Sequence, residues 1–160
     1  MAPISPSGLY MITDTSNYPV GVDQQNIDVA NARHQGFFDV LPIVSLRNNK
    51  PTAWRLEEIR TGTYRLSVST TSTPLDAMPV TVGPESEIHA LLHAPVNSVS
   101  HYWVLQDLGD DWYIIKYAGD TNYVWASSVG FPNDPQQISL VPWTSSNRGN
   151  FAFRIKPFGA

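Results

Sequence analysis

The sequence Tyr102-Trp103-Val104-Leu105, followed shortly by Asp111-Trp112-Tyr113-Ile114-Ile115, combines two strand-like segments separated by a polar turn. Both segments are rich in aromatic and branched apolar residues, which is typical of β-strands. The same design precedes it as Trp54-Arg55-Leu56 with Gly62-Thr63-Tyr64-Arg65-Leu66, and a half copy follows as Phe153-Arg154-Ile155. One strand–turn–strand pattern therefore recurs along the chain.

The copies are evenly spaced. The steps from Trp54 to Trp103 and from Trp103 to Phe153 are 49 and 50 residues, and Gly8-Leu9-Tyr10-Met11-Ile12 provides the partner that the last copy lacks. A fixed period of this length is typical of repeat architectures. We therefore predict a single domain over 1–160 made of three units, at about 8–61, 62–110 and 111–160.

Each unit is expected to hold four strands. The 13 Pro and 10 Gly residues separate short runs rich in Val, Ile, Tyr and Trp, and no helical apolar spacing continues beyond two turns. The expected strands lie at 9–14, 19–23, 38–46 and 53–59, then 63–69, 78–82, 87–94 and 102–108, and finally 112–117, 122–126, 136–141 and 151–157.

Alternation along these strands indicates which side chains point inward. Trp103 and Leu105 share one strand face, and the equivalent pairs are Trp54 with Leu56 and Phe153 with Ile155. Three copies of one inward set can close a barrel around a threefold axis, and closure removes exposed sheet edges. The predicted fold is an all-β β-trefoil of twelve strands in three pseudo-repeats of about 50 residues.

The composition excludes several classes of function. The 160 residues contain no cysteine, so no disulfide framework, thiol nucleophile or thiolate metal site can form. The formal charge of -4, with ten scattered basic residues, provides no basic stripe for nucleic acid. Neither a signal-like start nor a run of about 18 apolar residues occurs, so we expect no membrane partner and a cytoplasmic location.

The sequence also contains no recognisable set of catalytic residues. His89 and His93 would lie about 13 Å apart on a strand, too far for one metal ion. The serines lack the setting of a nucleophile elbow. We therefore predict a protein that is not an enzyme and that uses no metal and no cofactor.

The first unit is longer than the other two. The interval between its paired aromatics, Tyr10 and Trp54, is 44 residues, whereas the corresponding intervals are 39 and 40 in the second and third units. The extra residues fall most naturally within 24–37, between the second and third strands. Loops often carry function on a rigid scaffold, although a lengthened surface loop also costs little stability.

Further motifs accompany the repeat, namely Ser7-Gly8-Leu9-Tyr10-Met11-Ile12, Asn17-Tyr18-Pro19-Val20-Gly21-Val22-Asp23, Trp103-Val104-Leu105, Tyr113-Ile114-Ile115, Tyr123-Val124-Trp125, Gln136-Gln137-Ile138-Ser139-Leu140-Val141-Pro142 and Phe153-Arg154-Ile155. Together they cover nearly the full length and resemble the fungal β-trefoil serine protease inhibitors of the cospin type. The resemblance implies a cytoplasmic fungal protein that serves defence or regulates proteolysis. It also implies reversible inhibition of a trypsin-like serine protease by a substrate-like loop between the second and third strands.

On this resemblance, Arg33 is the predicted primary contact with the protease. It is the only basic residue in the longer loop, and its guanidinium suits the carboxylate at the base of a trypsin-like pocket. The flanking residues are Asn31, Ala32 and His34. The runner-up for the primary contact is Asn31 or Asn26. A second basic loop, consisting of Arg47, Asn48, Asn49 and Lys50, is a weaker candidate.

Two alternative functions follow from related families on the same scaffold. Mycocypins, which inhibit cysteine proteases, resemble this chain around Pro19, Val20, Gly21 and Val22, although only Gly21 remains of their glycine pair. Ricin-B-like lectins usually carry Gln-x-Trp in each unit, and Gln is absent from all three equivalent positions here. A glycan could still bind at a site made by Asp120, Asn122, Tyr123 and Trp125, unless the two aromatics alternate into the barrel.

Overall fold

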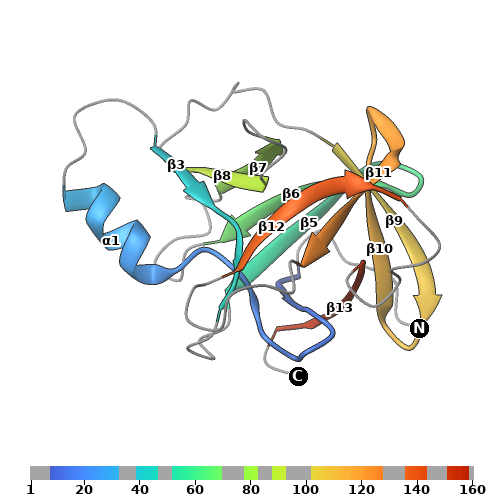
Figure 1. Ribbon diagram of the computed structural model, residues 1–160, viewed down its shortest axis with the longest axis horizontal. Helices are drawn as coiled ribbons and strands as arrows, with labels where there is room; N and C mark the ends of the chain where they lie inside the picture. The colour runs from blue at the N-terminus through green and yellow to red at the C-terminus, as the bar shows by residue number, and fades with distance from the viewer. Residues whose placement is uncertain are drawn as a thin grey trace.

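The computed structural model describes residues 8–32, 39–46, 52–69, 78–82, 88–92, 102–127, 136–143 and 151–158. Its strands form one 13-stranded sheet with a single helix beside it in the described part of the chain (Figure 1). The elements are β1 (Tyr10–Thr13), β2 (Val20–Gly21), α1 (Gln24–Ala32), β3 (Asp39–Pro42), β4 (Val44–Ser45), β5 (Ala53–Arg60), β6 (Thr63–Ser69), β7 (Met78–Val82), β8 (Ile88–Leu92), β9 (Tyr102–Gly109), β10 (Trp112–Tyr117), β11 (Asp120–Ser127), β12 (Gln136–Pro142) and β13 (Ala152–Pro157).

Six of the strands close into a barrel. β1 pairs with β13 and β5, β6 pairs with β5 and β9, and β10 pairs with β9 and β13, all antiparallel. The pairing repeats from unit to unit. Tyr10 lies opposite Trp54, Tyr64 lies opposite Trp103, and Tyr113 lies opposite Phe153, which is the third-unit equivalent of the two tryptophans. A closed ring of this kind leaves no barrel edge open to other chains.

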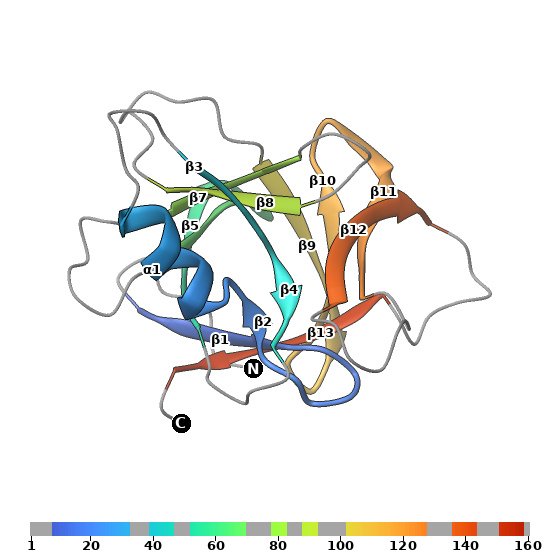
Figure 2. The ribbon, with the colours of Figure 1, turned by 60° about the vertical axis from the view of Figure 1, so that its left-hand side comes forward.

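The remaining seven strands form three hairpin-like pairs, β2 with β4, β7 with β8, and β11 with β12, and β3 adds to the second pair through β8. They are joined around a common centre, since the backbone N–H of Ile43 donates to Ile88 at 2.9 Å and that of Ile138 donates to Ile43 at 2.8 Å. Figure 2 shows β4 lying between β2 and β12, with which it pairs. A six-stranded barrel with three such pairs is a β-trefoil, and the predicted fold is confirmed.

The core contains the predicted inward set. Trp54, Trp103 and Phe153 are fully buried. Also fully buried are Leu56, which shares β5 with Trp54, and Leu66 and Ile115 on the partner strands β6 and β10. Leu105 is only partly buried but packs against the same cluster. The period-two pattern therefore identified the buried face of the barrel correctly.

The twelve expected strands are all present, and one of them is interrupted. The strand expected at 38–46 breaks at Ile43 and appears as β3 and β4. Ile43 uses its backbone for bonds across the centre of the three pairs, with its N–H directed to Ile88 and its carbonyl accepting from Ile138. These bonds replace the regular ladder at that residue.

A helix, α1, occupies much of the segment that was expected to be an extended loop. Asp23 caps its start, because the Asp23 side chain accepts a bond from the N–H of Gln25 at 3.0 Å and its carbonyl accepts from Asn26 at 2.9 Å. Gln24 also donates to Asp28 one turn later, at 3.0 Å. Among the described side chains of this helix only Ile27 joins the core, so its apolar spacing was too sparse to be recognised.

Candidate functional site

Helix α1 projects from the barrel on the side away from β9 and β10, as Figures 1 and 2 both show. Buried Ile27 attaches it to the core, whereas Val29 is exposed to solvent. This helix is the largest departure from threefold symmetry among the described residues. The longer first unit therefore places a distinct, protruding element on one side of the scaffold.

The predicted protease-binding residues fall into two groups, those within α1 and those outside the described residues. Asn26, Asn31 and Ala32 lie within α1, so the prediction that they belong to an extended, substrate-like loop is wrong for these three. The i to i+4 hydrogen bonding that defines a helix is incompatible with the extended backbone that a protease cleft accepts. Arg33 and His34 lie outside the described residues, as do Arg47, Asn48, Asn49 and Lys50 of the second basic loop.

The β1–β2 turn, which precedes the insertion, is held by a buried carboxylate. Asp14 accepts hydrogen bonds from the Ser45 hydroxyl at 2.7 Å and from the backbone N–H groups of Ser16 and Tyr18 at 2.9 and 3.0 Å. These bonds connect the β1–β2 turn to β4, and the N–H of Leu46 adds a bond to Pro19 at 2.6 Å. The sequence analysis missed Asp14 because its partners are up to 31 residues away.

The alternative cysteine-protease segment is part of the core. Pro19, Val20, Gly21 and Val22 are all buried, and Val20 accepts a bond from the Trp54 indole at 2.7 Å. A side chain added at Gly21 would collide with Thr52. The small residue at position 21 is therefore required for packing, and the prediction that this segment approaches a catalytic thiolate is corrected.

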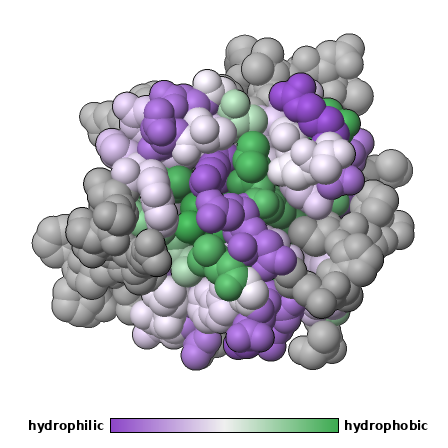
Figure 3. All heavy atoms as spheres, turned by 90° about the vertical axis from the view of Figure 1, so that its right-hand side faces the viewer, coloured by the Kyte–Doolittle hydropathy of each residue, from purple (hydrophilic) through white to green (hydrophobic). Residues whose placement is uncertain are grey.

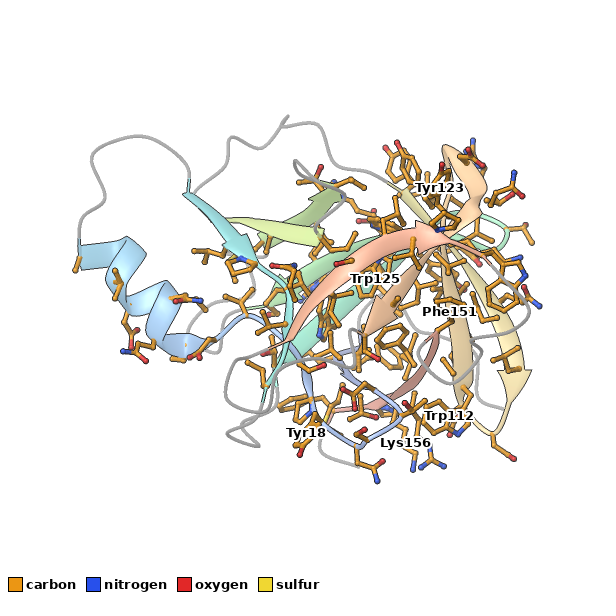
Figure 4. The ribbon with its side chains drawn as sticks, in the orientation of Figure 1. Tyr18, Trp112, Tyr123, Trp125, Phe151 and Lys156 are labelled. Carbon is orange, nitrogen blue, oxygen red and sulfur yellow. The ribbon has the colours of Figure 1, made fainter. Side chains whose placement is uncertain are left out.

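The alternative sugar site loses its main aromatic platform. Trp125 is fully buried and contacts Trp54, Trp103 and Phe153, with ring centroids 6.0, 5.4 and 5.9 Å away. Figure 4 shows it among the barrel strands, with Tyr123 at the edge of the molecule. Trp125 therefore points into the barrel, whereas Tyr123, which is 37% exposed, does not. The expectation that both aromatics alternate into the barrel holds only for Trp125.

The two polar residues of that site remain at the surface. The Asp120 carboxylate accepts a bond from the backbone N–H of Asn122 at 3.1 Å, and both residues are exposed. Because a sugar platform needs an accessible ring beside its polar groups, only Tyr123 could serve. The four predicted residues thus do not converge on one surface site.

A second polar residue that the sequence analysis did not single out lies at the centre of the three strand pairs. The side-chain amide nitrogen of Gln137 is 2.9 Å from each of three carbonyl oxygens, those of Ile43, Ile88 and Ile138. These three isoleucines are fully buried and come from all three units. Gln137 therefore satisfies backbone groups where the units meet.

The remaining expectations are that the protein uses no metal ion and has no membrane partner. His89 lies in strand β8 and His93 lies outside the described residues. Within the part of the chain that the structure describes, no group of three or more His, Cys, Asp or Glu residues could hold a metal ion. None of the described helical residues belongs to a helix long and apolar enough to cross a membrane.

The chain matches no protein-family model and no curated protein sequence at a significant level. Its fold, however, is similar to that of several solved β-trefoil proteins. A designed threefold-symmetric protein, ThreeFoil, has a TM-score of 0.60 at 14% identity and covers 93% of this chain and 98% of its own. Albumin 1 of winged bean has a TM-score of 0.60 at 15% identity, with 96% and 93% covered.

Among these structures is a proteinase inhibitor from Coprinopsis cinerea. It superimposes with a TM-score of 0.70 at 17% identity, and the match covers 96% of this chain and 99% of the inhibitor. The resemblance that the sequence motifs indicated is thereby confirmed for the fold.

Proposed function

We propose that this protein inhibits proteases, most specifically trypsin-like serine proteases, by reversibly occluding their active site with residues 33–38, which connect α1 to β3. The observation that carries the proposal is the asymmetric insertion on a scaffold similar to that of a proteinase inhibitor. Arg33 remains the proposed primary contact. Since Asn31 and Ala32 are helical, the remaining candidates are Arg33 and His34, which follow them in the chain and lie outside the described residues.

The attachment of the insertion supports a binding role. Its start is fixed by the Asp23 cap and by Ile27 in the core, and the strand that follows it, β3, is fixed by pairing with β8. A segment whose ends are already ordered loses less conformational entropy when it binds than a free peptide does. The insertion is therefore suited to insert into an enzyme cleft at low entropic cost.

The chemistry of the contact follows from the arginine. A trypsin-like pocket ends in a buried carboxylate, and a guanidinium can bind it with two parallel hydrogen bonds. Interfaces between proteases and inhibitors typically bury about 1,600 Å² in total, with most of the binding energy in a few residues. Arg33 would be such a residue, and no covalent step is needed.

The test measures inhibition of trypsin, chymotrypsin, subtilisin and papain by the purified chain and by the variant Arg33→Ala. We expect inhibition of trypsin and a loss of about 100-fold or more in the variant, because a buried charged anchor is typically an interface hot spot. Arg60→Ala is the matched control, since Arg60 is an exposed arginine at the end of β5.

Unchanged trypsin inhibition by Arg33→Ala would remove Arg33 from the proposal. Inhibition of papain alone would redirect the proposal to cysteine proteases, and no inhibition of any of the four enzymes would contradict it. Because Arg60→Ala changes the net charge equally, a loss shared by both variants would indicate general electrostatics and not a specific contact.

A further inference from the structure

Large apolar side chains are exposed at the end of the barrel that carries the β5–β6 and β9–β10 turns. Ile59 is 44% exposed and Leu108 is 48% exposed, and each lies five residues after the buried tryptophan of its strand. Phe158 occupies the same position after Phe153 and is 38% exposed. Three positions related by the repeat thus present apolar groups to solvent.

Ile59 and Leu108 are exposed because the strand pairing is irregular at both residues. In the β5–β6 hairpin, Glu58 pairs with Tyr64 and Arg60 with Thr63, so Ile59 is an extra residue without a partner. In the β9–β10 hairpin, Asp107 pairs with Tyr113 and Gly109 with Trp112, which leaves Leu108 in the same position. Such β-bulges redirect side chains, and here two equivalent bulges redirect apolar ones.

The hairpin ends are fastened to one another. The N–H of Leu105 donates to the carbonyl of Gly62 at 3.2 Å, and the N–H of Ile155 donates to that of Asp111 at 2.9 Å. The third end is closed by a bond of 2.8 Å from Phe158 to Leu9, which is itself 38% exposed. The apolar groups are therefore presented on a connected end of the barrel and not on separate loops.

Three tyrosines line the barrel at this end. Burial, with a hydrogen bond to the Glu58 carboxylate, raises the pKa of Tyr64 to about 12. Burial also raises the pKa of Tyr113, assisted by Asp107 and Asp111. Both phenols also interact electrostatically with Tyr10, so the three groups lie close together.

The surface around the apolar groups is negatively charged. The described ends of the two hairpins carry five carboxylates against the guanidinium groups of Arg60 and Arg65, and the five are Glu57, Glu58, Asp107, Asp110 and Asp111. Asp110 and Asp111 adopt φ of 55° and 68°, a region where Gly or Asn is normally preferred. Two carboxylates thus occupy turn positions at a conformational cost.

Two further basic groups border this surface on β13. Arg154 stacks on the Trp112 ring at 5.4 Å, and Lys156 follows it on β13. Figure 4 shows Trp112 and Lys156 beside each other at the lower edge of the molecule. The face over β9 and β10 in Figure 3 correspondingly shows apolar side chains among strongly hydrophilic ones. The negative charge is therefore concentrated over the two hairpin turns.

We propose that this end of the barrel, defined by Ile59, Leu108 and Phe158 with the carboxylates around them, is a docking surface for a protein segment that carries basic side chains between apolar ones. The apolar groups gain free energy when they are covered, and the carboxylates select a cationic partner. A second copy docked through the same end would bring two acidic surfaces together, which disfavours it. Because α1 projects from the other side, this surface is separate from the proposed protease-binding segment.

The test uses the full chain and a short fluorescent peptide of alternating lysine and leucine, with lysine–serine and glutamate–leucine peptides for comparison. We expect the lysine–leucine peptide to bind, and Ile59→Ser with Leu108→Ser to weaken its affinity about tenfold or more. Val29→Ser on α1 is the matched control, since Val29 is also an exposed apolar residue. It should leave the affinity unchanged.

A second variant isolates the charge. Asp110→Asn with Asp111→Asn removes two carboxylates but keeps side chains that tolerate positive φ, so the turn should fold as before. We expect weaker peptide binding at low salt and a smaller difference at high salt, because exposed charges are screened. Protease inhibition, measured in parallel, should be the same in both double variants as in the unmodified chain.

Three results would overturn the docking surface: no binding of the lysine–leucine peptide, equal binding of the glutamate–leucine peptide, or full affinity in the Ile59 and Leu108 variant. Self-association that this variant abolishes would replace the basic partner by a second copy. Loss of trypsin inhibition by Arg33→Ala with peptide binding intact would show that the two surfaces act separately.

Discussion

Replacing Trp125 by alanine should cost more stability than any surface change in this protein. The side chain is fully buried and its ring lies within 6.0 Å of the rings of Trp54, Trp103 and Phe153, so it joins β11 to the three equivalent positions of the barrel. Large-to-small substitution of a buried tryptophan typically costs about 3 to 5 kcal/mol, because transfer energy is lost and a cavity remains. Aromatic pairing adds about 0.5 to 1.5 kcal/mol per pair, which places Trp125→Ala near the upper end, about 5 kcal/mol.

The assay is urea unfolding followed by far-ultraviolet circular dichroism, which does not depend on the fluorescence of the tryptophan that is removed. A loss of about 5 kcal/mol approaches the total stability of many domains, so Trp125→Phe provides a second measurement. This variant keeps an aromatic ring and removes an indole N–H that has no hydrogen-bond partner among the described residues. It should cost clearly less, about 1 to 3 kcal/mol.

Tyr123→Ala is the control, because Tyr123 lies two residues away on the same strand but is exposed. It should change the free energy of unfolding by about 0.5 kcal/mol or less, as surface substitutions usually do. If Trp125→Ala cost about 1 kcal/mol or less, or if Tyr123→Ala cost as much, Trp125 would not be the central contact between β11 and the barrel.

Two further predictions concern polar groups. Gln137→Ala should destabilise the fold by about 1 to 3 kcal/mol, because the two amide N–H groups that the buried carbonyls of Ile43, Ile88 and Ile138 share are lost, while Gln106→Ala on the exposed face of β9 should have little effect in the same urea assay. Because the folded-state pKa of Tyr64 is raised from 10.0 to about 12, its contribution to stability is complete below pH 10 and is lost as the pH rises towards 12. Tyr64→Phe should therefore flatten the decline of unfolding free energy across this window, and equal slopes in urea titrations of both proteins would contradict this reasoning.

The site was less predictable than the barrel. Alternation placed Tyr123 and Trp125 on one strand face, but their burial differs because only Trp125 meets side chains from all three units. Among its described side chains, helix α1 has a single core contact, Ile27, so the apolar spacing could not reveal the helix, and its cap at Asp23 is the signal that could have done so. The cytoplasmic location, the fungal origin and the role of Arg33 stay predictions.

The sequence by itself determined the barrel, because the inward positions around Trp54, Trp103 and Phe153 repeat along the chain with a period that strand geometry makes readable. Only the tertiary structure decided where the polar and exposed groups act. Gln137 satisfies carbonyls from residues far apart in the chain, and Ile59 and Leu108 are exposed by bulges that depend on how two strands pair. Such features arise from contacts between distant segments, and no local period in the sequence encodes them.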